Sequence, residues 1–431
     1  MKLSPRLPAL LLAALVVTAC APQTASDSSS DKDEKTGTLR VWLFQEVGNK
    51  PKEQVVDSVV DAFEKAHDGT KVDVEYIPVE TRAQRVKAAF NDPSSAPDVM
   101  EYGNTDTAGY VKDGGLLDVT KEFGDWSEAK DTDPTARQSV TVDDRIYGSP
   151  FYVGVRALYY RTDVFKELGL EVPKTMAELA ATARKIRAAK PELYGLVVGG
   201  AYTYGAMPFI WANGGELADG KGGSYASAIS GAAAQKGIKE YTSLFTDDNC
   251  PAAKCAGMGG NDTITAFAAG KAGMAIGGDF SHTAVEAGKV KGEYAVVPLP
   301  GITAGSIAPA FAGGNNIGVL KSTAHRTLAV DLMEQLTSKK TQASMFDAMG
   351  FLPTFADVRQ QAASEQPYVK PFAQTLAAGT KFVPASPAWS QIDSSLVLPT
   401  MFQEVISGKK NVAAASGEAA KKMNAAFGSV G

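Results

Sequence analysis

The sequence predicts an α/β protein with two lobes, each a β-sheet flanked by helices, and with a cleft between them. Segments typical of strands alternate with segments typical of helices, which favours parallel β-α-β units. The chain has 431 residues, which is more than one ordinary hydrophobic core organises and enough for two. Aromatic residues, amides and glycines gather where predicted strands end, as expected beside a ligand cleft.

The alternation of strands and helices begins at residue 38. Residues 38–44 (TLRVWLF) alternate along their length and are rich in β-branched and aromatic side chains, which predicts a strand. The segment 50–67 places Val55, Val59 and Phe63 on one helical stripe, and Gly69 follows it as a helix stop. The next predicted elements are a strand at 71–79, a helix at 81–90 and a strand at 97–103.

The middle of the chain continues this pattern without a compositional linker, so ordinary strands must join the two lobes. Residues 155–170 read as a strand, a turn and a helix that stops at Gly169, and Thr175 with Glu178 forms a capping box for the next helix. Further strands are expected at 193–200, 273–278, 293–300 and 315–320, and further helices at 204–214, 231–245, 324–337 and 340–349.

The N-terminal segment has the pattern of an export signal. Lys2 and Arg6 precede an apolar run over 7–17 that is shorter than the roughly 20 residues needed to span a bilayer. The tetrapeptide 17–20 (VTAC) resembles the bacterial lipobox, which implies that Cys20 is lipidated and becomes the mature N-terminus. The alternative is an ordinary secretory peptide that is cut nearby. Residues 21–37 are polar and are expected to form a flexible tether.

The other two cysteines, Cys250 and Cys255, form an even pair in an exported chain, which favours a disulfide between them. A zinc site is not expected, because no second cysteine or histidine pair stands near them and the three histidines of the chain are scattered. The sequence therefore predicts no metal and no cofactor.

Composition and motifs exclude several function classes. The net charge of −5 provides no broad basic surface, so nucleic acid is not an expected partner. The sequence contains no nucleophile elbow, no phosphate-binding loop and no zinc-protease motif. A pair of catalytic carboxylates in a cleft has no sequence motif, so a glycosidase stays open as an alternative.

Several clusters at strand ends suit a sugar, whose apolar ring face stacks on aromatic rings while its hydroxyls bond to amides and acids. The candidate ligand contacts are Gln45, Glu46, Asn104, Asp106, Tyr152, Trp211, Asp279, Phe280, Asn315, Asn316 and Trp389.

Each candidate also has a structural interpretation. Asn104 and Asp106 are suited to capping the following helix, and Asp279 is suited to capping a helix near Ser281. The helical periodicity around Trp211 is compatible with a position in the core and equally with a position in the cleft. Trp389 follows Pro387 in what reads as a loop, and this context favours a cleft position.

Four segments, taken in order, resemble the extracellular solute-binding protein family 1 of ABC sugar importers. They are 144–179 (DRIYGSPFYVGVRALYYRTDVFKELGLEVPKTMAEL), 267–281 (FAAGKAGMAIGGDFS), 313–338 (GGNNIGVLKSTAHRTLAVDLMEQLTS) and 349–354 (MGFLPT). The resemblance implies a type II-like periplasmic-binding-protein fold with an interlobe hinge and cleft, and a monomer that closes on an oligosaccharide without changing it. It also implies a permease partner and an exported protein that the N-terminal lipid anchors to the outer face of the cell membrane.

The resemblance further implies how the chain divides. Residues 1–20 would be the lipoprotein signal peptide and 21–37 the tether. The first lobe would comprise 38–149 and about 273–322, and the second 150–272 and about 323–431. The segment 98–110 (DVMEYGNTDTAGY) is similar to actinobacterial lipoproteins that bind chito-oligosaccharides such as diacetylchitobiose.

The same resemblance suggests roles for three of the candidates. Asp279 occupies a slot where the family often has an aromatic residue, which indicates a polar contact there. Asn315 and Asn316 become candidates for hydroxyl or acetamido contacts. Two other classes of function are weighed beside a sugar-binding protein, namely a secreted polysaccharide-degrading lipoprotein enzyme and a surface adhesion or scaffold protein.

Overall fold

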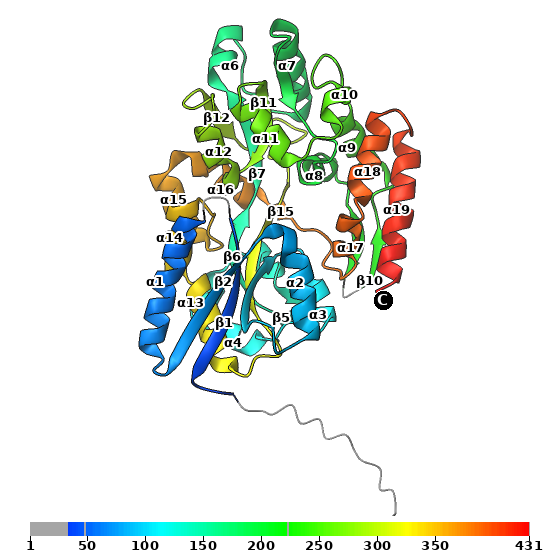
Figure 1. The fold of residues 1–431 in the computed structure, drawn as a ribbon. Coiled ribbons are helices and arrows are strands. Elements are labelled where there is room, and N and C mark those ends of the chain that lie inside the picture. The colour runs from blue at the N-terminus through cyan, green and yellow to red at the C-terminus, as the bar shows by residue number, and fades with distance from the viewer. Residues whose placement is uncertain (1–32, 47–48, 222–223, 431) are drawn as a thin grey trace, which may run out of the picture.

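The computed structural model describes residues 33–46, 49–221 and 224–430, arranged as two lobes (Figure 1). The two-lobe α/β fold predicted from the sequence is confirmed. The signal peptide, Cys20 and most of the tether lie outside the described residues. No helix in the described part of the chain is both long and apolar enough to cross a membrane.

The first lobe is built on a five-stranded sheet with the order β2-β1-β3-β14-β6. Its strands are β1 (Gly37–Phe44), β2 (Thr70–Ile77), β3 (Val99–Gly103), β6 (Ser149–Gly154) and β14 (Gly313–Val319). Strand β1 runs parallel to β2 and β3, whereas β14 runs antiparallel to β3 and β6.

Helices cover both faces of this sheet. On one face, α1 (Lys50–Ala66), α13 (Arg326–Thr337) and α14 (Lys339–Met349) pack together over a core that includes Val56, Phe63 and Leu332. On the other face, α2 (Val79–Asn91) and α3 (Thr107–Lys112) enclose Trp42, Val86 and Tyr102. The smaller elements of the lobe are α4 (Thr120–Asp125), η1 (Ala129–Asp131), α5 (Pro134–Gln138), β4 (Thr141–Val142) and β5 (Arg145–Ile146).

The second lobe contains a four-stranded sheet with the order β12-β7-β11-β8. Its strands are β7 (Arg156–Arg161), β8 (Tyr194–Val197), β11 (Ala272–Gly278) and β12 (Tyr294–Val297). The surrounding elements are α6 (Thr162–Leu168), α7 (Met176–Ala189), α8 (Thr203–Ala212), β9 (Ala218–Lys221), β10 (Ser224–Ser227), α9 (Ala232–Thr242), α10 (Ala252–Cys255), α11 (Gly260–Ala268), η2 (Asp279–Ser281) and α12 (His282–Glu286). The C-terminal part adds α15 (Ala356–Glu365), η3 (Pro367–Val369), α16 (Lys370–Ala378), α17 (Trp389–Ser394), α18 (Val397–Ile406) and α19 (Val412–Gly428), and β13 (Ala310–Phe311) pairs with β15 (Thr380–Lys381).

The strand pairing corrects the expected lobe boundaries in two places. Strands β11 and β12, which were expected in the first lobe, pair with β7 in the second. Helices α13 and α14, which were expected in the second lobe, pack on α1 in the first. The resemblance rested on separate sequence segments that do not show which strands pair, and a fully buried strand such as β11 has the same apolar pattern in either sheet.

The disulfide between Cys250 and Cys255 is confirmed, and both cysteines are buried in the second lobe. Their sequence separation is 5 residues, so the bond closes a short turn and does not join distant parts of the fold.

A buried ion pair fixes α1 against the first sheet. The ammonium of Lys52 donates to the carbonyl of Phe44 and to Glu101 Oε2, both at 2.8 Å, and the side chains of Lys52 and Glu101 are fully buried. Glu101 Oε2 also accepts the backbone N–H of Phe44 at 2.8 Å. The pair therefore joins the end of β1, the first turn of α1 and the middle of β3.

We expect Lys52→Met to lower the free energy of unfolding by about 3–5 kcal/mol, because it leaves the buried Glu101 carboxylate without its counter-charge. Denaturant unfolding checks this value. The matched control is Lys50→Met, since Lys50 lies on the same turn but is exposed; this change should alter stability by less than about 0.5 kcal/mol. Equal stability of the two variants would contradict the expected contribution of the buried pair to the free energy of unfolding.

Candidate ligand-binding site

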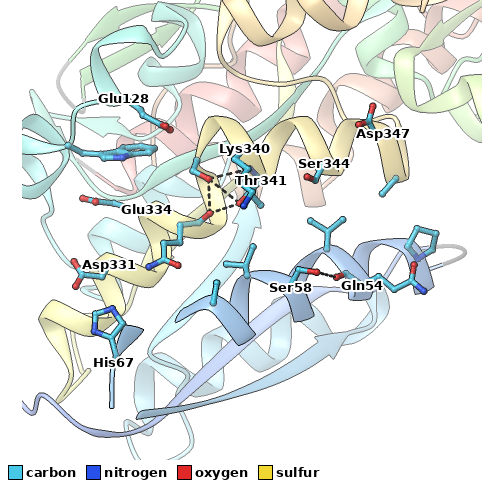
Figure 2. Close-up of a pocket in the computed structure, with 18 residues that line it drawn as sticks. Gln54, Ser58, His67, Glu128, Asp331, Glu334, Lys340, Thr341, Ser344 and Asp347 are labelled. Atoms are coloured by element: carbon cyan, nitrogen blue, oxygen red, sulfur yellow. Dashed lines mark hydrogen bonds between the residues drawn. The ribbon is translucent and has the colours of Figure 1, made fainter. Parts of the chain in front are cut away.

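A cavity of about 820 Å³ forms a groove on the outer face of the first lobe. Gln54 and Ser58 on α1 face Ser344 on α14 across it, and Asp331 with Glu334 lies toward its other end (Figure 2). Its lining comes from the first lobe alone. A ligand in this groove would therefore contact one lobe and would not bridge the two.

A smaller cavity, of about 310 Å³, lies between the lobes and is lined by both. Glu46 and Asn104 reach it from the C-terminal ends of β1 and β3, where ligands bind in open α/β sheets. Opposite them, Arg156 begins β7 and Asp279 follows β11. We take this cavity as the candidate site, because it draws side chains from both lobes.

The backbone crossings between the lobes form part of the cavity wall. Gly154 ends β6 one residue before Val155 leads into β7, and Gly314 lies in β14 close to β6. Gly314 has φ +125°, and a Cβ atom there would lie 2.1 Å from the carbonyl oxygen of Tyr152. Glycine is therefore required at this position for the two strands to approach each other.

The first-lobe side of the cavity is a hydrogen-bonded polar surface. The amide of Asn315 donates to Glu101 Oε1 at 2.6 Å and to the hydroxyl of Tyr152 at 2.7 Å. Glu46 lies 3.9 Å from the Lys52 ammonium, and burial raises the pKa of Glu46. The Lys52–Glu101 pair thus contacts two polar residues of the cavity wall, namely Asn315 through a hydrogen bond to Glu101 and Glu46 through the charge of Lys52.

Stacked aromatic rings stand on both sides of the cavity. In the first lobe, Tyr152 and Phe351 stack with their ring centroids 4.2 Å apart. In the second, Tyr204 and Phe311 stack at 4.6 Å. Phe280 is a large side chain that is 49% exposed beside them. Such rings can receive the apolar face of a sugar ring.

The acidic group on the second-lobe side is Asp279. Its Oδ1 accepts the backbone N–H of Val155 at 2.9 Å, and its side chain is buried. Burial raises the pKa of Asp279 to about 7. Near neutral pH, this group therefore exists in both the neutral and the ionised form.

The structure brings together six of the predicted contact residues at the interlobe cavity. They are Glu46, Asn104, Tyr152, Asp279, Phe280 and Asn315. The amide of Asn104 already donates to the carbonyl of Ala312 at 3.0 Å, so it also holds the crossing strand in place.

Three other predicted polar contacts do not line this cavity. Gln45 is exposed beyond β1, and Asn316 is buried where it bonds to Ser139. Asp106 instead lies 3.3 Å from the hydroxyl of Ser390, a hydrogen bond between the two lobes. Burial raises the pKa of Asp106 to about 6.

The two predicted tryptophan contacts require correction, because the structure places neither at the cavity. Trp211 is 4% exposed and Trp389 is 1% exposed, and both belong to the core of the second lobe. Trp389 begins α17 and does not lie in an open loop, and α17 packs against α18 and α19. Neither indole offers a ring face to a ligand in this structure.

The cavity-lining residues that sequence reasoning missed include all of its arginines and three of its aromatic residues, namely Arg82, Arg156, Tyr204, Phe311 and Phe351. Tyr204 lies in the predicted helix 204–214, which also contains Trp211, and Phe351 lies in the segment 349–354 (MGFLPT). Arg156 could have been identified from its position, because it begins the strand that directly follows the crossing from β6.

Within the described residues, no group of three or more His, Cys, Asp or Glu side chains could hold a metal ion. The arrangement of the cavity offers stacking surfaces and hydrogen-bond partners, which serve reversible binding.

Comparison with known proteins gives a consistent result. The model of the family described as bacterial extracellular solute-binding protein matches residues 49–343. The diacetylchitobiose binding protein DasA of Streptomyces coelicolor is 27% identical over 94% of this chain and 95% of that protein. The galactooligosaccharide-binding protein of Bacillus subtilis is 27% identical over 84% of each chain.

Solved structures show the same fold. An ABC transporter solute-binding protein from Thermotoga lettingae, bound with α-D-tagatose, has a TM-score of 0.76 and 26% identity over 91% of this chain and 100% of that one. The sugar-binding protein MalE of Xanthomonas citri has a TM-score of 0.80 and 22% identity over 91% of this chain and 98% of that one.

We expect Asp279→Asn to flatten the dependence of stability on pH. The pKa of this carboxyl is raised in the folded protein, so its ionisation opposes folding as pH rises from about 4 to about 7. The variant should match the wild type near pH 4 and exceed its free energy of unfolding above pH 7 by up to about 4 kcal/mol. Denaturant unfolding over this pH range checks the difference. The exposed control Asp61→Asn should parallel the wild type, and a parallel curve for Asp279→Asn would contradict the prediction.

Proposed function

Because the chain belongs to the bacterial extracellular solute-binding protein family, we propose that it captures an oligosaccharide between its lobes for the permease of a carbohydrate ABC importer. The observation that carries this proposal is the interlobe cavity, with one stacked aromatic pair and several polar groups on each side. The members of this family bind solutes and are not enzymes. The sugar is therefore released unchanged.

We propose a chito-oligosaccharide, such as diacetylchitobiose, as the ligand. This is the ligand named for the Streptomyces coelicolor relative, which matches 94% of the chain. The cavity also suits a sugar that carries acetamido groups, since the guanidinium of Arg156 is a hydrogen-bond donor at its wall.

Capture follows from contacts that exist only when the lobes meet. Asp106 bonds to Ser390 across the lobes, and the Lys112 ammonium donates to the carbonyl of Val430 at 2.8 Å. A sugar that contacts both cavity walls binds this closed arrangement more tightly than an open one. That difference in affinity drives closure about the crossing strands, and the permease would meet the closed form.

We further propose that Cys20 carries the lipid that anchors the exported, monomeric protein to the outer face of the membrane. The chain enters the described structure beside α13, where the Asp33 carboxylate accepts the backbone N–H of Thr327 at 3.0 Å. The polar segment between Cys20 and this contact would act as the tether.

Calorimetric titration with diacetylchitobiose, longer chito-oligosaccharides, cellobiose, maltose and galactobiose tests the function. We expect one-to-one binding of the chito-oligosaccharides at micromolar or lower Kd, with the sugar recovered intact. Tyr204→Ala should weaken binding about tenfold, because it removes one of the two rings of the second-lobe aromatic stack.

The control for this titration is Gln54→Ala in the groove of the first lobe, which should bind as the wild type does. Loss of affinity in Gln54→Ala but not in Tyr204→Ala would move the site to that groove. Absence of binding to every sugar, or shortening of the sugar, would contradict the proposed function.

Cys20→Ala tests the anchor separately. Without the thiol, no lipid can be attached, so the protein should leave the membrane fraction and appear in soluble form. Fractionation with detection of the chain checks this outcome. Retention of Cys20→Ala in the membrane at the level of the wild type would contradict lipidation at this residue.

A further inference from the structure

Arg156 occupies a central position at the interlobe cavity. It is the first residue of β7 and pairs with Gly278 of β11, the residue before Asp279. Its side chain is half-buried and forms part of the cavity wall beside Phe280 and Tyr204. Any ligand that fills the cavity meets this guanidinium.

Aromatic rings, and not carboxylates, hold the guanidinium of Arg156. Its central carbon lies 5.2–5.8 Å from four ring centroids, those of Tyr202, Tyr204, Phe280 and Phe311. Its Nε donates to the hydroxyl of Tyr202 at 3.0 Å, which sets the orientation of the planar group. An arginine held in this way is pre-organised to donate from its two terminal nitrogens.

No ion pair neutralises the charge of Arg156, although Asp279 is near enough for this charge to offset part of the rise in the pKa of its carboxyl. Among the residues that the structure describes, no carboxylate lies within ion-pair distance of it, and no acceptor bonds to its terminal nitrogens. Asp279 directs Oδ1 to the backbone N–H of Val155. A half-buried guanidinium with free donors favours a ligand that supplies an acceptor.

We propose that Arg156 determines ligand specificity by binding a planar oxygen acceptor on the sugar, either the carbonyl of an acetamido group or a carboxylate. The fork of terminal N–H groups matches a planar acceptor better than it matches a tetrahedral hydroxyl. This inference rests on the proposed function and narrows its substrate class to sugars that bear an acyl or carboxyl group. Arg156 contacts the ligand, and Tyr202 is a positioning residue that acts through Arg156.

The test measures the ratio of affinities for two groups of sugars by calorimetric titration of the full chain. Diacetylchitobiose carries the carbonyl, cellobiuronic acid carries the carboxylate, and cellobiose carries hydroxyls alone. We expect the wild type to prefer at least one of the first two over cellobiose by about tenfold or more. Affinity that falls steeply with salt identifies the carboxylate as the acceptor, whereas affinity that is insensitive to salt identifies the carbonyl.

Arg156→Lys keeps the positive charge but loses the planar fork, so it should lose most of this preference while still binding cellobiose. Arg156→Met removes the charge as well and should lose the rest. Tyr202→Phe should reduce the preference by a smaller factor, because the guanidinium keeps its ring contacts but loses its hydrogen bond. Thermal unfolding verifies that each variant is folded.

The matched control is Arg85→Lys. Arg85 also lies over an aromatic ring, that of Trp42, but it is paired with Glu75 and lies outside the cavity, so its replacement should leave the ratio unchanged. A ratio in Arg156→Lys equal to that of the wild type would overturn the inference and leave the proposed function standing. Failure of the wild type to bind any sugar would overturn both.

Discussion

The buried Lys52–Glu101 pair is the constraint on which the first-lobe side of the cavity depends. Burying two charges is unfavourable unless further hydrogen bonds satisfy them, and here the carbonyl and N–H of Phe44 and the amide of Asn315 do so. Because Lys52 lies on α1, Phe44 on β1, Glu101 on β3 and Asn315 on β14, the pair and its hydrogen bonds hold these four elements together. Asn315 then holds the hydroxyl of Tyr152 at the cavity.

The crossings between the lobes explain how the second wall is positioned. Only Val155 separates β6 of one sheet from β7 of the other, so Arg156 emerges beside the cavity as soon as the chain changes lobes. The N–H of Val155 is bonded to Asp279, which ties the crossing to the end of β11. The same short segment therefore joins the two sheets and forms part of the cavity wall.

The distribution of polarity within the cavity suits reversible capture. Stacked rings on both sides provide apolar surface, and the polar groups at their edges provide hydrogen bonds that can fix the orientation of a ligand. The larger groove on the first lobe lacks this two-sided arrangement, since α1, α13 and α14 belong to the same lobe. Cavity size alone would have selected the groove, whereas the presence of groups from both lobes selects the interlobe site.

The sequence by itself predicted most of the longer strands and helices but not β6, together with the Cys250–Cys255 bond, the family and six of the cavity residues, because these depend on local periodicity and short motifs. Only the tertiary structure decided that β11 and β12 join the second sheet and that α13 and α14 cover the first. It also decided that Trp211 and Trp389 are enclosed, whereas Tyr204 and Arg156 face the ligand space. The physical reason is that an apolar pattern in the sequence indicates that a side chain will be buried or stacked. It does not indicate which other segment of the chain that side chain will pack against. The surroundings of Trp389 are set by helices that follow it in the chain, and those of Arg156 by four rings from three separate segments.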